Sequence, residues 1–389
     1  MADTMEAAAP IFIMPPEVWA MIGKLLDHRS VDAATKASKQ MRTQLIPRRF
    51  HEVRFDDTQR HLAQSLGAFL CSHGDLGKDQ IQKAVRIATI VVDGRKEPID
   101  GQTAIHGPGK ADFIDKELPS LIVNSLSKMR NLRVLDLDVV CFSDQQTHDF
   151  IRLLSHAPHW SRVNMLIFNG PERLLTATVR HCGYENITAL HLSQWFGTQE
   201  YDVARACPNL EKLRLYYDSL EVTAAGCWPS LEPLLLESVT EDFKGLKWLI
   251  LSEKELPITG MLNAENWEQK LLRNTLQFAA RVGTFDRIER VALTLRHRRF
   301  GPIVTEIAAD HDIHSTEHPD YEYHIHDWYR KQIERLARHS ESLREVCILD
   351  DWPVVYRGTR PNRDAPMVIQ RGDLSENVPS STFPVGLVG

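Results

Sequence analysis

The sequence predicts an α+β protein in which a small all-helical module at the N-terminus precedes an irregular repeat of helices and strands. Two patterns support this prediction: amphipathic helical stripes before residue 50, and one strand pattern that recurs along most of the remaining chain. The composition, with 43% hydrophobic and 25% charged residues, is that of an ordinary globular chain. A length of 389 residues allows two or three domains or one elongated repeat domain.

The N-terminal module is predicted from two apolar stripes. Proline suits the first turn of a helix because its missing N–H would lack a partner there, and Glu17 complements the positive helix end. The first stripe has spacings of three and four and consists of Val18, Trp19, Ile22, Leu25 and Leu26. A second stripe runs from Val31 to Leu45 and is expected to stop at Pro47. A module of about forty residues struggles to bury its own core, so we expect it to dock on an external surface.

This module resembles an F-box. The residues that match the family pattern are Met14, Pro15, Glu17, Val18, Ile22, Leu25, Leu26, Val31, Ser38, Lys39 and Arg42. The stretch from Ile46 to Phe55 is also similar to F-box proteins of filamentous fungi, so the resemblance covers residues 12 to 55. Two features depart from the pattern: Met14 replaces the usual leucine, and residues 33–37 are poor in large apolar side chains. The alternative is an ordinary amphipathic helix pair packed on the body of the protein.

The F-box resemblance implies a function and a set of partners. Such a chain is the substrate-recognition subunit of an SCF-type cullin–RING ubiquitin ligase. It binds the Skp-type adaptor, and through it the cullin, with its F-box, and it holds a target protein with its C-terminal region. It catalyses no bond change itself and needs no cofactor. The residues expected to contact the adaptor are Pro15, Val18, Ile22, Leu25, Leu26 and Val31.

The strand pattern apolar-x-x-apolar-x-apolar recurs after residue 80. Seven copies begin at Leu132, Val163, Ile187, Leu210, Leu246, Ile288 and Leu343, and an eighth, earliest copy begins at Ile87. Amphipathic helical segments precede the strands, and the central copies lie about 23 residues apart, as in a leucine-rich repeat. The later copies are farther apart, and most copies lack the asparagine of typical leucine-rich repeats. We therefore expect an irregular α/β leucine-rich-repeat-like solenoid.

These patterns divide the chain into four parts. Residues 1–11 are expected to be a flexible N-terminus, and residues 12–50 form the F-box-like docking module. Residues 51–356 are predicted to be the repeat domain that binds the substrate. Residues 357–389 are rich in proline, glycine, serine and aspartate, so they are expected to be an extended or mobile tail.

Strand alternation predicts which side chains of the repeat domain face a partner. Successive side chains of a strand point to opposite faces, so the residues between the inward-facing leucines lie on the open face. Repeat proteins bind partners on such faces. The residues on this face that we expect to contact a substrate are Asp136, Ile167, His191, Arg214 and Tyr216.

No motif in the sequence strongly indicates a catalytic centre. Five histidines between His311 and His326 alternate with carboxylates and have ligand types suited to zinc, nickel or copper, but Pro319 and the hydrophilic surroundings favour an incidental surface loop. The loop from His106 to Ala111 resembles a phosphate-binding loop but lacks Ser or Thr after Lys110. We therefore expect no metal and no enzymatic activity. The alternatives are an F-box-like scaffold outside any ligase and a metal-dependent enzyme that uses the histidine cluster.

Charge and cysteine usage limit the partners and the compartment. The net charge is −6 without a long basic stretch, which argues against nucleic acid as the main partner. Six isolated cysteines without C-x-x-C spacing indicate a reducing compartment. No apolar run approaches the roughly 18 residues of a membrane span. We expect a cytoplasmic or nuclear protein without membrane contact.

Overall fold

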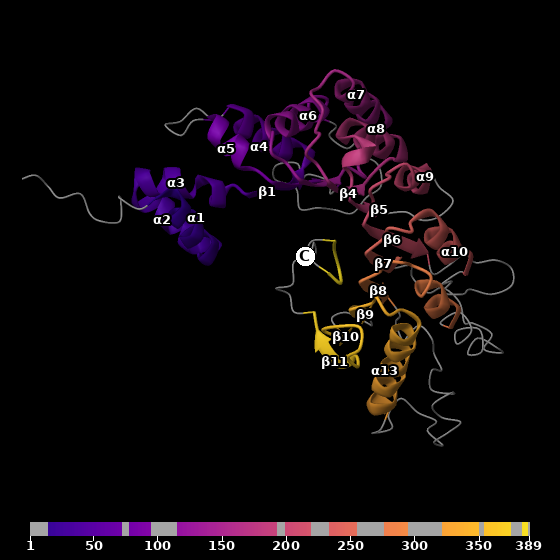
Figure 1. Cartoon of the computed structure of the whole chain (residues 1–389). Helices are drawn as coiled ribbons and strands as arrows, with labels where there is room; N and C mark the ends of the chain where they lie inside the picture. Colours follow the sequence, from indigo (N-terminus) through magenta and orange to yellow (C-terminus); the bar gives the residue numbers. More distant parts are fainter. Residues whose placement is uncertain are drawn as a thin grey trace, which may run out of the picture. The chain divides into compact units, whose positions relative to one another are not determined.

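The structure is a computed structural model, and its description covers part of the chain. The described residues are 15–71, 78–94, 115–192, 199–218, 233–254, 276–294, 321–349, 354–374 and 383–387. The chain divides into two compact units, residues 1–186 and residues 187–389. Both units are mixed α/β (Figure 1). Among the described helices, none combines the length and the apolar character that crossing a membrane requires.

Three short helices open the first unit. They are α1 (Pro16–Leu25), α2 (His28–Ala37) and α3 (Lys39–Arg49). The Asp27 carboxylate caps α2 by accepting a hydrogen bond from the Ser30 N–H at 2.7 Å, and the Ser38 hydroxyl caps α3. The second apolar stripe is therefore divided between two helices. The prediction that this stripe stops at Pro47 is wrong, since α3 continues to Arg49. Pro47 lies in the last turn of α3, where it removes only one backbone hydrogen bond.

A small apolar core holds these helices together. Each helix contributes one buried side chain: Trp19 from α1, Val31 from α2 and Leu45 from α3. All three side chains are at most 3% exposed. Around them pack the half-buried side chains of Leu26, Ala34 and Met41. The module thus buries a modest core of its own, which a helix pair without a third helix would lack.

The rest of the first unit is a parallel sheet with helices between its strands. The strands pair in chain order and are β1 (Glu52–Thr58), β2 (Ile87–Asp93), β3 (Val134–Asp138) and β4 (Met165–Asn169). The helices are α4 (Gln59–Cys71), α5 (Lys78–Ala84), α6 (Leu118–Lys128), α7 (Asp144–Leu154) and α8 (Glu172–Cys182), with a 3-10 turn η2 (Tyr184–Asn186) after α8. Helices α4, α6, α7 and α8 pack one against the next (Figure 1).

Alternate residues of these strands form the core of the first unit. The strand register places Ile90, Leu137 and Phe168 in one row. A second row contains Ala88, Leu135 and Leu166. All six side chains are at most 1% exposed, so the predicted inward direction of the strand leucines is confirmed.

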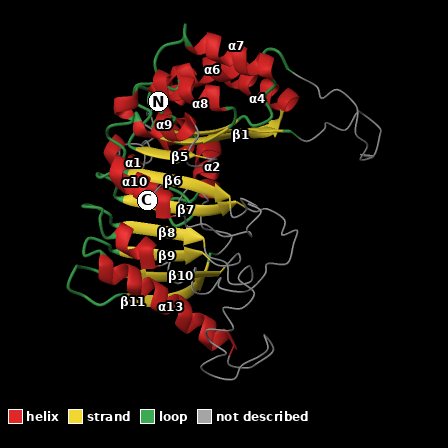
Figure 2. Ribbon diagram, turned by 90° about the vertical axis from the view of Figure 1, so that its right-hand side faces the viewer, coloured by secondary structure: helices red, strands yellow, loops and turns green. Residues whose placement is uncertain are grey.

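The second unit combines parallel and antiparallel strands. Five parallel strands pair in chain order: β5 (Ala189–Leu192), β6 (Lys212–Asp218), β7 (Trp248–Lys254), β8 (Arg290–Thr294) and β9 (Glu345–Leu349). In Figure 2 the arrows of β6 to β8 run side by side in one direction. Two antiparallel strands follow, β10 (Val354–Thr359) and β11 (Val368–Asp373). The described helices are α9 (Gln199–Arg205), α10 (Pro233–Asp242) and α13 (Tyr321–His339).

The strand predictions agree with this structure except at the C-terminal end. All eight copies of the predicted strand pattern fall on strands, from β2 to β9. Residues 357–389 were expected to be an extended or mobile tail, yet they contain the end of β10, all of β11 and a buried segment at 383–387. Residues 357–359 and 368–373 pair with strands of the second unit, which composition alone does not reveal.

Candidate docking surfaces

Helix α1 exposes an apolar stripe. Val18, Met21 and Leu25 are 37%, 66% and 87% exposed. They make up half of the six large hydrophobic side chains that are exposed in the described part of the chain. Spacings of three and four place them along one face of the helix. The opposite face carries Trp19 into the module core. An exposed apolar stripe on a helix that already has a core on its other side is typical of a docking surface.

The structure separates the six predicted adaptor-binding residues into two groups. Pro15, Val18 and Leu25 are exposed and Ile22 is half-buried, so these four are open to a partner. Leu26 and Val31 pack in the module core, and Val31 is only 2% exposed. Val31 is therefore a core residue and not an open contact. Met21 was missed, although its position three after Val18 and four before Leu25 could have indicated it.

The alanine-rich second helix fits closely against α3. The Thr35 side chain is fully buried, and its hydroxyl accepts a hydrogen bond from the Arg49 guanidinium at 3.2 Å. The Arg42 guanidinium donates to the Thr35 carbonyl at 2.9 Å, and Arg49 also pairs with Asp32 at 2.6 Å. Arg42 thus reaches the α2 backbone, and Arg49 binds two α2 side chains, beside the small residues Ala33, Ala34 and Ala37. The departure from the F-box pattern thus has a structural role within the module.

Asp136 and Ile167 lie side by side on the first unit's sheet. The strand register places Thr89, Asp136 and Ile167 in one row across β2, β3 and β4, with Arg54 of β1 at its end. Burial raises the pKa of Asp136 to about 6, and the positive charge of Arg54 only partly offsets this effect. A half-buried carboxyl with a raised pKa is suited to accept or donate a hydrogen bond at neutral pH.

His191 and Arg214 are neighbours in the second unit but do not form an open surface. They face each other across β5 and β6. Arg214 is only 8% exposed, donates to the Ser252 hydroxyl at 3.2 Å and donates to the Val385 carbonyl. Burial and the Arg214 charge hold the pKa of His191 well below its usual range. The backbone of Tyr216 pairs with Ser252, while its side chain lies outside the described residues.

A segment of the chain's own C-terminal region, Phe383–Leu387, covers this part of the second unit. The Phe383 ring packs edge-on against Trp248 with centroids 5.8 Å apart, and Leu387 is fully buried. The Lys212 ammonium donates to the Leu387 carbonyl at 3.2 Å and lies 3.8 Å from the centre of the Trp248 ring. The prediction that Arg214 is open to a substrate is therefore wrong for this structure, because residues 383–387 occupy that position.

The histidine cluster lies mostly outside the described residues. Residues 311–320 are not described, nor are the side chains of 321–325. The ring of His326 lies 5.5 Å from that of Tyr356. Within the described ranges, no three or more His, Cys, Asp or Glu side chains are placed to hold a metal ion. The loop at 106–111 also lies outside the described residues.

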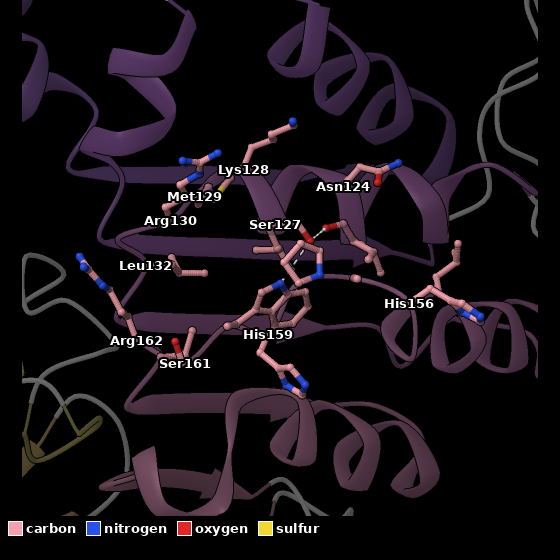
Figure 3. Close-up of a pocket in the computed structure, with 17 residues that line it drawn as sticks. Asn124, Ser127, Lys128, Met129, Arg130, Leu132, His156, His159, Ser161 and Arg162 are labelled. Atoms are coloured by element: carbon pink, nitrogen blue, oxygen red, sulfur yellow. Dashed lines mark hydrogen bonds between the residues drawn. The ribbon is translucent and has the colours of Figure 1, made fainter.

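A pocket of about 620 Å³ opens at the ends of α6 and α7 in the first unit (Figure 3). Its walls carry Lys128, Arg130, Arg162, His156 and His159, whereas Met129, Pro158 and Trp160 supply apolar surface. None of the described residues that line it is acidic. The His159 and His181 rings stack 5.0 Å apart beside Trp160, and His159 Nδ1 lies 3.0 Å from the His181 carbonyl. The pocket is therefore positively charged at its rim and apolar within.

No protein-family model and no curated protein matches this chain.

Proposed function

We propose that this chain is the substrate-recognition subunit of an SCF-type cullin–RING ubiquitin ligase. The exposed stripe of Val18, Met21 and Leu25 on α1 supports this proposal, together with the F-box resemblance of residues 12–55, in which Val18 and Leu25 match the family pattern. In this proposal α1–α3 form the F-box and the strand–helix units that follow form an irregular leucine-rich-repeat-like solenoid. The pairing of consecutive parallel strands within each unit supports such a solenoid.

The chain would act by proximity. The F-box would dock on the Skp-type adaptor and the repeat region would hold the target, so that ubiquitin transfer by the other subunits becomes effectively intramolecular. No side chain of the receptor needs to take part in bond making. A standard interface of about 1,600 Å² rests on a few central anchors, and Leu25 is the most exposed candidate for one of them.

A single substitution tests the adaptor contact. Leu25→Asp places a charge at an 87% exposed position and leaves Trp19, Val31 and Leu45 untouched. We expect it to weaken adaptor binding by at least tenfold, because loss of a central anchor costs about 2 kcal/mol. The measurement is co-purification of adaptor and cullin with the full chain. Val140→Asp, at a 59% exposed apolar position after β3, is the matched control and should bind normally.

The outcome separates the ligase subunit from a scaffold. The exposure of Ala33 and Ala37 on α2 favours the scaffold, because alanines offer a partner little apolar area. Recovery of the adaptor without cullin would support the scaffold. Equal recovery of the adaptor with Leu25→Asp and with the unchanged chain would overturn the proposed docking surface.

A further inference from the structure

The residues that lead into the first unit's strands form a basic ladder with two arginines at its centre. His51, Arg86 and Arg133 each stand directly before a strand, β1, β2 and β3. The Arg86 N–H donates to the His51 carbonyl and the Arg133 N–H donates to the Arg86 carbonyl, both at 2.8 Å. These residues are therefore neighbours at the strand spacing of about 4.8 Å. Before β4 the same position is taken by Asn164, whose N–H donates to the Arg133 carbonyl at 2.9 Å, and Arg162 lies two residues earlier in the chain.

The charges in this ladder repel one another. Burial lowers the pKa of Arg86, and the positive charges of Arg133 and Arg162 lower it further. Burial also lowers the pKa of His51, with added effects from Arg48, Arg86 and Arg133 that the nearby Glu52 only partly opposes. Like charges on adjacent strands destabilise a sheet. Within the described part of the chain, no carboxylate forms an ion pair with Arg86, Arg133 or Arg162.

A hydrogen-bond network holds two of these arginines in place. The Arg86 guanidinium donates to the Lys83 carbonyl at 2.7 Å. The Asn131 amide donates to the same carbonyl at 2.8 Å, and its oxygen accepts a hydrogen bond from Arg162. Each guanidinium carries five N–H donors, so most donors of Arg86 and Arg162 remain for a ligand. Arginines fixed in advance lose less side-chain freedom when they bind an anion.

Arg162 also lines the pocket at the ends of α6 and α7, so the ladder and the pocket form one surface. We propose that this surface binds a phosphorylated segment of a target protein. The phosphate would lie against Arg86, Arg133 and Arg162, and an apolar side chain of the same segment would enter the pocket beside Met129 and Trp160. Arginine forks suit phosphate oxygens because they bind them through paired, charge-assisted hydrogen bonds.

The short length of the ladder favours a peptide over nucleic acid. It spans four strands, whereas nucleic-acid surfaces run along many phosphates and the chain as a whole carries a net charge of −6. The apolar interior of the pocket also fits a side chain that follows or precedes a phosphorylated residue. The inference rests on the proposed function only in naming the segment as part of a ubiquitination target.

The test uses the full chain and fluorescent degenerate peptides that contain phosphoserine or phosphothreonine, with the unphosphorylated library as comparison. We expect phosphopeptides to bind at least tenfold more tightly, and binding to weaken as salt rises. Arg133→Gln combined with Arg162→Gln should remove most of this preference. Arg173→Gln, on the exposed side of α8, is the matched control and should retain it.

Three results would overturn the proposal. They are equal binding of phosphorylated and unphosphorylated peptides, unchanged phosphopeptide binding by the double variant, and tighter binding of a single-stranded RNA 20-mer than of the peptides. Thermal unfolding of the double variant distinguishes lost binding from lost structure, and we expect an unchanged or higher melting temperature because repulsion is relieved. Peptide binding needs no adaptor, so its failure is distinguishable from a failure of adaptor docking.

Discussion

The two units share one backbone arrangement at the residues that lead into their strands, but they carry different charges there. In the first unit these residues are His51, Arg86, Arg133 and Asn164, with no acid among them. In the second unit the same N–H to carbonyl ladder connects Thr188, Glu211, Lys247, Glu289 and Arg344, each directly before a strand. The charges from Glu211 to Arg344 alternate, and the Lys247 ammonium pairs with the Glu211 carboxylate at 2.6 Å.

This difference shows which charges at the ladder positions the fold requires and which ones a partner could require. The second unit builds the ladder with alternating acids and bases, of which Glu211 and Lys247 form an ion pair, so the backbone geometry does not demand arginine. The first unit builds it with like charges, which cost stability. An anionic partner that binds the arginines would offset that cost, which is why the first unit's ladder is the better candidate for a binding surface.

The largest expected effect concerns the segment Phe383–Leu387, which covers part of the second unit. Phe383→Ala removes a ring that packs on Trp248 and lies 5.6 Å from the Arg290 guanidinium. We expect the free energy of unfolding, measured in urea, to fall by about 2 to 3 kcal/mol, because a large buried ring leaves a cavity. Hydrogen exchange at the β6 and β7 amides should increase. Val368→Ala, at a 54% exposed position on β11, should change stability by less than about 0.5 kcal/mol; equal effects of the two variants would contradict the role assigned to Phe383.

The next effect in size is the pH dependence of stability, which runs in opposite directions in the two units. The pKa of Asp136 in the first unit is raised from 3.8 to about 6, so the native state holds this proton more tightly, and stability falls as pH rises from about 4 to about 6. Burial and the Arg214 charge lower the pKa of His191 in the second unit, so its contribution is present above the ordinary value of 6.5 and is lost as pH falls below it.

Asp136→Asn isolates the first of these two effects. At pH 7 the asparagine avoids the cost of a half-buried charge, so we expect the free energy of unfolding to rise by about 1 to 2 kcal/mol, less than the full shift would give because Asp136 retains some contact with solvent. At pH 4 the two proteins should be almost equally stable. Urea unfolding at both pH values measures the difference, and a gain of the same size at pH 4 would show that the charge is not its source.

The smallest effect concerns the ladders themselves. Lys247→Glu breaks the pair with Glu211 and places three acids in succession, so we expect a loss of about 1 kcal/mol. Arg133→Glu places an acid beside Arg86 in the first unit's ladder, so we expect a gain of about 0.5 kcal/mol together with loss of phosphopeptide binding. Effects of the same sign in both units would contradict the electrostatic difference between the ladders.

Much of the repeat region could be predicted from the sequence because its signal is local. The spacing of Leu132, Leu135 and Leu137 identifies an inward-facing strand, and each of the other copies does the same for its own strand. The basic ladder also had a local signal, since Arg86 and Arg133 stand at the same place before successive strands. This ladder could have been found by comparing the residue before each predicted strand as well as the residues within the strand.

The burial of Arg214 could not be predicted in this way. Its partner carbonyl belongs to Val385, 171 residues later in the chain, and no periodicity connects the two positions. The same applies to Val31, which fits the F-box pattern but faces Trp19 and Leu45 only because three helices meet there. Contacts between distant segments depend on how the elements pack, and the sequence pattern of one element does not contain that information.

The position of Phe383–Leu387 in the chain has a consequence for synthesis. In the first unit each strand from β1 to β4 pairs with the strand made just before or after it, so this sheet can assemble while translation continues. In the second unit the surface formed by Lys212 and Trp248 receives its cover only when residues 383–387 have left the ribosome. Until then its tryptophan and its cations face solvent, so a chain that stalls before residue 383 would present to chaperones a surface that these residues later cover.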